Sequence, residues 1–156
     1  MQDNVLLHAT SLVKNFGPTT ALAGVDLTVH RGESIAIMGA SGSGKTTLLH
    51  VLAGITTPDS GTVLYYGGVD PVAVSSLPDA DRTRLRREEF GFVFQQGFLL
   101  PELTAVENVA LPLLLAGSRR REAEAQAARW LASLGLAGME DRRPGQLSGG
   151  QAQRVA

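Results

Sequence analysis

The sequence predicts an α/β fold in which strands prevail in the first half and helices in the second. Apolar and polar residues alternate at Val25, Leu27 and Val29, which is typical of a half-buried strand. An apolar run, a glycine-rich turn and a helical pattern follow one another at residues 34–54. Apolar side chains recur at helical spacing in residues 119–134. Strands around a strand–turn–helix unit, followed by a helix-rich segment, indicate α/β with a helical subdomain.

The elements of the first half surround the glycine-rich turn. Residues 34–38, SIAIM, form an unbroken apolar run, as expected of a strand buried on both faces. A helix is expected to begin near residue 45 and to end at Gly54, with one apolar face formed by Leu48, Leu49, Leu52 and Ala53. Residues 56–61, TTPDSG, predict a turn, and residues 62–66 predict another strand.

The second half is expected to be mostly helical. Residues 79–89 predict a short helix, and residues 90–94, FGFVF, predict a strand. Ser118 is expected to cap the helix over residues 119–134, and Gly135 to end it. The apolar stripe of that helix comprises Ala123, Ala127, Trp130, Leu131 and Leu134.

Composition bounds the class of protein. A chain of 156 residues with 44% hydrophobic and 19% charged residues is long enough for one globular domain with a core. A net charge of −1 gives no electrostatic reason to expect nucleic acid. The arginines at 82–87 and 119–121 are followed by glutamates, which favours solvated helix faces. The absence of cysteine excludes disulfides and thiolate metal sites and suits a reducing compartment.

Targeting and membrane signals are absent from the sequence pattern. The first residues lack the basic start and apolar stretch of a signal peptide. The most apolar segment, residues 109–117, is shorter than the roughly 20 residues of a spanning helix, and Pro112 interrupts it. A cytoplasmic protein is therefore expected, which meets a membrane only through a partner.

The glycine-rich turn predicts a nucleoside triphosphate site. Residues 39–46, GASGSGKT, match G-x-x-x-x-G-K-[ST] at every fixed position. Gly39, Gly42 and Gly44 permit left-handed or crowded backbone, so that successive N–H groups can point at one anion. Lys45 would supply a mobile charge for the phosphates, and the Thr46 hydroxyl would ligate Mg²⁺. The structural alternative is a glycine-rich turn that binds nothing.

A second glycine-rich motif separates the classes of phosphate-loop proteins. LSGGQ, residues 147–151, in a chain that also carries GASGSGKTT, resembles the signature sequence of ATP-binding cassette (ABC) ATPases. FVFQ at residues 92–95 resembles the family's Q-loop, and LVKNFG at residues 12–17 resembles the segment whose aromatic residue stacks on adenine. The resemblance covers essentially the whole chain. It implies a P-loop NTPase fold with a RecA-like core and an antiparallel β subdomain over residues 1–95, and a helical signature subdomain over residues 96–156.

The resemblance also implies a shared ATP–Mg²⁺ site. Two cassettes, expected to be a homodimer, would pair head to tail, and Ser148, Gly149 and Gly150 of one would meet the γ-phosphate held by the other. Gln95 would contact Mg²⁺ or the attacking water, and Phe16 would stack on adenine. The expected nucleotide-binding residues are Phe16, Gly39, Ser41, Gly42, Ser43, Gly44, Lys45, Thr46, Thr47, Gln95, Ser148, Gly149, Gly150 and Gln151; Lys45 and Gln95 would serve catalysis, and Thr46 and Gln95 the metal.

Structural alternatives to these implied roles stay open. Ser148 with its two glycines could merely cap a helix, Gln95 could be a polar residue at a strand end, and Phe16 could belong to the core.

One branch of the family is especially similar. Residues 90–117, with RTRLRREE before them, resemble the ATPases of macrolide-type exporters, lipoprotein-release complexes and the cell-division ABC complex. The resemblance implies a place on the inner face of the membrane and an integral membrane permease whose coupling helix enters an apolar groove. The residues expected to form that groove are Phe98, Leu99, Leu100, Pro101 and Leu103, although a buried hairpin would use the same side chains.

Part of the family pattern is missing. ABC ATPases continue to a strand that ends in Asp-Glu and then to a switch histidine, and no residue before Ala156 takes these roles. Glu88, Glu89 and Glu107 do not follow an apolar strand at the right place. The chain is therefore expected to be the front part of a longer ATPase and not to hydrolyse ATP alone. A non-transport ABC ATPase and a nonenzymatic nucleotide-binding fragment remain the competing functions.

Overall fold

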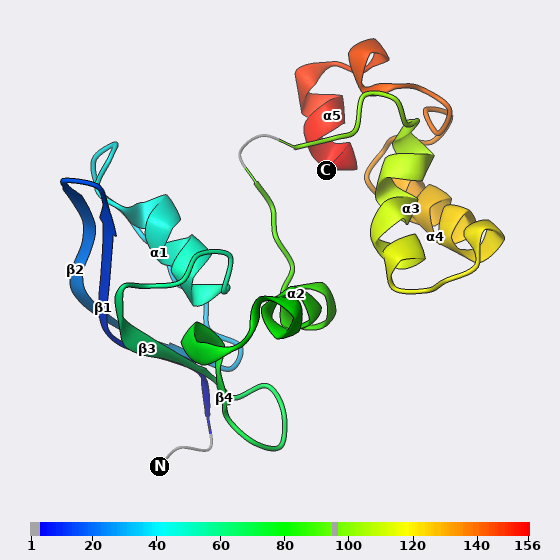
Figure 1. Cartoon of the computed structure of the whole chain (residues 1–156). Coiled ribbons are helices and arrows are strands. Elements are labelled where there is room, and N and C mark those ends of the chain that lie inside the picture. The colour runs from blue at the N-terminus through cyan, green and yellow to red at the C-terminus, as the bar shows by residue number, and fades with distance from the viewer. Residues whose placement is uncertain (1–3, 95–96) are drawn as a thin grey trace. The chain divides into compact units, whose positions relative to one another are not determined.

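The computed structural model describes residues 4–94 and 97–156. The chain divides into two compact units, Met1–Phe90 and Gly91–Ala156. The first unit contains the strands and the second consists of helices and their connections (Figure 1). The α/β class predicted from the sequence is confirmed.

The first unit is built on a four-stranded antiparallel sheet. Its strands are β1 (Val5–Phe16), β2 (Thr19–His30), β3 (Ser60–Tyr65) and β4 (Val72–Ala73), in the order β2-β1-β3-β4. β1 lies between its hairpin partner β2 and β3, and it pairs with both (Figure 1). The strand predicted around Val25–Val29 is confirmed as part of β2, and the strand predicted at residues 62–66 as most of β3.

Helix α1 (Lys45–Leu52) covers the sheet with one apolar face. Leu48, Val51 and Leu52 are buried against a core that includes Leu7, Leu12 and Val63. The predicted helix is confirmed, and Gly54 follows its end with φ +65°. The predicted face was wrong at Leu49, which is 53% exposed, because the helix turns Val51 toward the sheet instead.

The predicted strand at residues 34–38 does not form. These residues lie in no strand and are mostly exposed; Met38 is 88% exposed. A strand requires hydrogen-bonded neighbours on at least one edge, and the described sheet contains only β1, β2, β3 and β4. The apolar pattern is therefore present without the pairing that would make it a strand.

The rest of the first unit contains β4, a 3₁₀ turn at Val74–Ser76 and helix α2 (Asp79–Glu88). The predicted helix over residues 79–89 is confirmed. Three of its arginines pair with acidic neighbours on the same helix, which supports a solvated face; the pairs are Arg82–Asp79, Arg84–Asp81 and Arg87–Glu88.

The strand predicted at residues 90–94 is also absent. The phenylalanine rings of this segment pack on one another, and its backbone pairs with none of the strands β1 to β4. Phe92 stacks on Phe94 with ring centroids 5.7 Å apart, and Phe94 meets Phe98 edge-on at 5.3 Å.

The second unit consists of α3 (Ala105–Leu115), α4 (Arg120–Ser133), a 3₁₀ turn at Pro144–Gln146 and α5 (Gly149–Val155). α3 and α4 lie against each other (Figure 1). Small residues line this contact, and Ala110, Ala123 and Ala127 are fully buried there. The described part of the chain contains no helix long and apolar enough to cross a bilayer.

Two details of the α4 prediction were wrong. The residue at the cap position is Arg119 rather than Ser118, and it makes no side-chain cap bond. Trp130 and Leu134 are 58% and 46% exposed, so the buried stripe narrows to Ala123, Ala127 and Leu131. Gly135 follows the helix with φ +72°, as predicted for its end.

Candidate nucleotide-binding site

The phosphate-loop sequence forms a turn that opens directly into α1. Gly44 is the residue before the helix and has φ +84°. A Cβ atom on Gly44 would lie 2.1 Å from the carbonyl oxygen of Ala21 in β2, so no larger residue fits without movement. Gly42 has φ +78° but open space around its Cα. The backbone freedom expected of these two glycines is therefore used, and Gly44 also seats the loop against β2.

The side chain of Lys45 folds back over this loop. Its Nζ donates hydrogen bonds to the carbonyl oxygens of Gly39 at 2.9 Å and Ala40 at 2.6 Å, with Ser43 Oγ at 3.4 Å. The Ser43 amide donates in turn to the Ala40 carbonyl at 3.3 Å. A single ammonium is thus held at the start of a helix whose first N–H groups have no intrahelical partners. A positive charge and a helix N-terminus converge where an anion is expected.

Hydroxyl residues lie in the phosphate loop and directly after it. Ser41 and Thr46 are exposed, whereas Thr47 is half-buried in the first turn of α1. Among residues 4–94 and 97–156, no group of three His, Cys, Asp or Glu side chains could hold a metal ion. Mg²⁺ in nucleotide sites keeps water ligands and needs few protein oxygens, so a single Thr46 hydroxyl beside phosphate oxygens fits that ion.

Phe16 lies at the end of β1, opposite Thr19 across the β1–β2 hairpin. The residue is 53% exposed, and the Nζ of Lys14 lies 5.6 Å from the ring centroid. The core alternative for Phe16 is therefore not supported by its exposure. The hairpin belongs to the same unit as the phosphate loop, and Gly44 contacts its second strand at Ala21.

The signature sequence begins helix α5 with a reciprocal cap. Ser148 Oγ accepts from the Gln151 amide at 3.3 Å, and Gln151 Oε1 accepts from the Ser148 amide at 2.8 Å. Ser148 still carries a hydroxyl proton that can be donated elsewhere. Gly149 and Gly150 are exposed, and within the described chain nothing lies within 4 Å of a Cβ built on either. The chain's own packing therefore does not require glycine at these positions.

Gln95, the remaining predicted contact of metal and water, lies outside the described residues. The segment after it lines a groove with the signature helix in the second unit; the lining residues are Gly97, Phe98, Leu99, Pro144, Gly149, Ala152 and Gln153. Phe98 is 71% exposed and has φ +47°, a conformation that L-residues rarely adopt. Sequence reasoning missed the α5 side of this groove, because the contact joins segments about fifty residues apart.

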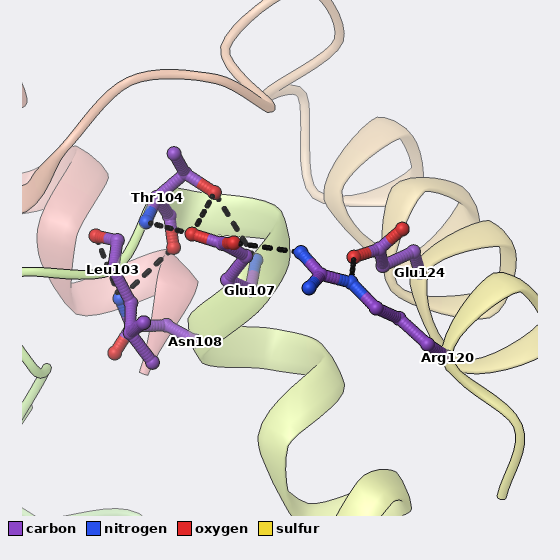
Figure 2. A network of polar contacts seen from close by, with 6 residues as sticks. All are labelled: Leu103, Thr104, Glu107, Asn108, Arg120 and Glu124. Carbon is purple, nitrogen blue, oxygen red and sulfur yellow. Dashed lines mark hydrogen bonds and ion pairs between the residues drawn. The ribbon is translucent and has the colours of Figure 1, made fainter.

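The three glutamates weighed in the sequence, Glu88, Glu89 and Glu107, are committed to other partners. Glu107 Oε2 accepts from the Thr104 amide at 3.0 Å and the Thr104 hydroxyl at 3.1 Å, while Arg120 donates to Oε1 at 3.0 Å (Figure 2). These hydrogen bonds from Thr104, together with Arg120, lower the pKa of the Glu107 carboxyl. Glu89 accepts from the Tyr65 hydroxyl at 2.9 Å, and Glu88 pairs with Arg87. None of the three is arranged as a general base.

Two polar side chains, one in each unit, hold loops in place and were missed from the sequence. Asp59, within the predicted turn of residues 56–61, binds the end of β1 through Lys14 and Asn15. Asn108, in the first turn of α3, binds backbone atoms of residues 100–104. Asp59 fits a turn pattern and Asn108 fits a helical pattern, but neither pattern indicates which distant groups these side chains bind.

A phosphate loop that is hydrogen-bonded by Lys45, and a helix that begins with the capped SGGQ sequence, are together the features of an ATP-binding cassette. The family model described as ABC transporter matches residues 22–156, and the chain belongs to this family.

Within the family, the chain is similar to proteins named lipoprotein-releasing system ATP-binding protein LolD. It is 47% identical to that of Geobacter metallireducens over 97% of this chain and 67% of the relative. It is 43% identical to the protein of Xanthomonas oryzae pv. oryzae, over 99% of this chain and 64% of the relative. The dimeric cassette MJ0796 bound to ADP and Pi matches with a TM-score of 0.84 at 37% identity, over 96% of this chain and 66% of that one. The chain thus spans about two thirds of the length of these relatives.

Proposed function

We propose that the protein is the ATP-binding subunit of an ABC membrane transport complex, in which MgATP binds between two head-to-tail cassettes. The observation that carries this proposal is Lys45, whose ammonium is held 2.6–2.9 Å from two loop carbonyls at the start of α1. An incoming triphosphate offers this cation stronger, charged acceptors than neutral carbonyls. Thr46 would ligate Mg²⁺, which would supply positive charge to the phosphate oxygens.

The pairing of cassettes is supported by the signature helix. Glycine at 149 and 150 is not needed by contacts inside the described chain, so a requirement for small residues would come from a close external approach. A γ-phosphate presented by a second cassette satisfies it, because the amides at the start of α5 and the Ser148 hydroxyl remain available as donors. The structural relative MJ0796 is described as a dimer bound to ADP and Pi.

Coupling to a membrane permease is the second part of the proposal. The groove beside Phe98 presents the exposed Phe98 and the neighbouring Leu99, and would receive a helix of that permease at the inner face of the membrane. The relatives named for lipoprotein release favour that branch of exporters over the macrolide and cell-division branches.

Hydrolysis by the whole protein needs a group that orients the attacking water, and Glu88, Glu89 and Glu107 do not supply it.

The test is ATP affinity measured by calorimetry in the presence of Mg²⁺. Lys45→Ala removes the ammonium and should weaken binding by about 10- to 100-fold, as expected for loss of charge-assisted hydrogen bonds. Arg121→Ala, which removes an exposed charge from α4, serves as the control and should leave affinity unchanged. Equal affinities of the Lys45 variant and the parent would refute the assignment.

A further inference from the structure

The carboxylate of Asp59 gathers three donors at the end of β1. Its Oδ1 accepts from Lys14 Nζ at 2.8 Å, and its Oδ2 accepts from the Asn15 amide at 2.6 Å and from Asn15 Nδ2 at 3.2 Å. The backbone amide of Asp59 also donates to the Val13 carbonyl at 2.8 Å. The hydrogen bonds from Lys14 and Asn15 lower the pKa of the Asp59 carboxyl, so it is ionised at neutral pH. One residue of the turn before β3 therefore fixes the two residues that precede Phe16.

This arrangement places the Lys14 ammonium against Phe16. Residues 14 and 16 are two apart on β1, whose pairing with β2 shifts register between Lys14 and Asn15. The Nζ lies over the Phe16 ring, 5.6 Å from its centroid, which is within the range of a cation–π contact. The Lys14 side chain is only 15% exposed, whereas the Phe16 residue is 53% exposed. The ammonium thus lies over the ring, while the Phe16 residue as a whole remains exposed.

The same contacts tie the hairpin to the phosphate loop. Asn15, held by Asp59, accepts from the Thr20 hydroxyl at 2.7 Å through its Oδ1. Thr20 is followed by Ala21, whose carbonyl faces Gly44 at the start of α1. A short series of contacts therefore runs from Asp59 to the phosphate loop within one unit. The series connects the residue before Phe16 to the phosphate loop through β2.

We propose that Asp59 is a positioning residue for the nucleotide base: it holds Lys14 on one face of Phe16, so that a flat base stacks on the opposite face at a set distance from the phosphate loop. The inference rests on the proposed function, because it takes the ligand of the phosphate loop to be a nucleotide. The ligand class is a nucleoside triphosphate whose base provides a π-face. Asp59 acts through Lys14 and Phe16 and does not itself touch the ligand.

A purely structural role for Asp59 predicts something different. If it only stabilised the turn before β3, its loss would weaken binding of every loop ligand alike, or would lower stability without changing binding. A positioning role predicts a loss that depends on the presence of a base. Inorganic tripolyphosphate carries the phosphate chain without a base and separates the two.

The experiment compares binding of ATP and of inorganic tripolyphosphate, both with Mg²⁺, by calorimetry. Asp59→Asn and Lys14→Met should weaken ATP binding by about 3- to 10-fold, a part of the full stacking contribution, and change tripolyphosphate binding less than twofold. Lys14→Arg keeps a cation over the ring and should restore most of the ATP affinity. Phe16→Ala sets the upper limit of the base-dependent loss. Thermal unfolding of each variant verifies folding, and Lys14→Met provides the test if Asp59→Asn does not fold.

Equal losses for ATP and tripolyphosphate in these variants would overturn the inference, as would unchanged ATP affinity. If neither ligand binds the parent, or if Lys45→Ala leaves both affinities unchanged, the proposed function itself is wrong and this inference falls with it. The two failures are therefore distinguished by the behaviour of the parent and of the Lys45 variant.

Discussion

The side chain of Asn108 hydrogen-bonds the backbone of Leu100 in both directions. Its Oδ1 accepts from the Leu100 amide at 2.8 Å, and its Nδ2 donates to the Leu100 carbonyl at 3.1 Å. The same Nδ2 donates to the Leu103 carbonyl at 3.2 Å and the Thr104 carbonyl at 2.9 Å. One amide at the start of α3 therefore holds the loop that precedes the helix. Figure 2 shows Asn108 beside Leu103 and Thr104.

Replacement of Asn108 should loosen this loop. Asn108→Ala removes all four contacts and is expected to cost about 1–3 kcal/mol of stability. Asn108→Asp keeps the acceptor for Leu100 but places a carboxylate oxygen against the Leu103 and Thr104 carbonyls, and should be at least as destabilising. Urea unfolding measures the cost, and hydrogen exchange of the Leu100 amide reports the loop directly. An unchanged hydrogen-exchange rate of the Leu100 amide in both variants would show that Asn108 does not hold this loop.

Gly44 and Gly42 form a matched pair in the phosphate loop. Both have φ near +80°, but a Cβ on Gly44 would meet the Ala21 carbonyl, whereas one on Gly42 meets nothing described within 4 Å. Gly42→Ala should cost about 1–2 kcal/mol for the left-handed backbone alone. Gly44→Ala should cost about 2–5 kcal/mol, because overpacking adds to that strain. Equal costs in thermal or urea unfolding would show that the close approach to β2 is not important.

The Glu107 carboxylate should give the second unit a pH-dependent stability. Its pKa is lowered in the folded protein by Thr104 and Arg120 (Figure 2). A depressed folded pKa stabilises the fold above the ordinary carboxyl value of about 4.3 and loses this contribution as pH falls through the folded pKa.

Glu107→Gln keeps the shape of the capping side chain and removes the charge. The variant should therefore unfold at lower temperature than the parent at pH 7, and the gap should narrow below about pH 4. Glu122→Gln, an exposed glutamate in the first turn of α4, is the control. A gap between Glu107→Gln and the parent that stays constant across this range would contradict the assignment.

Ser148 should separate helix capping from pairing of cassettes. Ser148→Ala removes the cap of α5 and is expected to cost about 1 kcal/mol locally, while Ser148→Thr keeps a capping oxygen. Ser148→Arg places a long cation where a second cassette would approach, and should leave ATP binding to the phosphate loop intact while preventing ATP-dependent dimers. Sedimentation velocity with MgATP provides the measurement. Persistence of the nucleotide-dependent dimer in Ser148→Arg would rule out the role of Ser148 across the interface.

Local patterns in the sequence predicted the elements whose determinants lie close together in the chain. The helix after the phosphate loop and the helix ends at Gly54 and Gly135 were all correct. A cap, a left-handed glycine and a 3.6-residue period are each encoded within about one or two turns. The roles assigned to the nucleotide-contacting residues stay predictions, because they concern ligands and a second cassette.

Patterns that depend on distant partners were less reliable. Residues 34–38 and 90–94 have strand-like composition, yet neither is a strand in this structure. On α4, Trp130 and Leu134 have the spacing of core residues but remain exposed, because the alanines of α3 and α4 form the contact. Periodicity specifies which residues share a face, and the neighbouring element decides how much of that face is covered.

The sequence by itself determined the two glycine motifs, the α/β class and the family, since these reside in contiguous residues whose chemistry can be read directly. Only the tertiary structure decided that Asp59 holds Lys14 and Asn15, that Asn108 latches Leu100, and that Gly44 abuts Ala21. Each of these contacts is made by groups that are several residues to more than forty apart in the chain. Folding brings such groups together through the packing of whole elements, which no short stretch of sequence encodes.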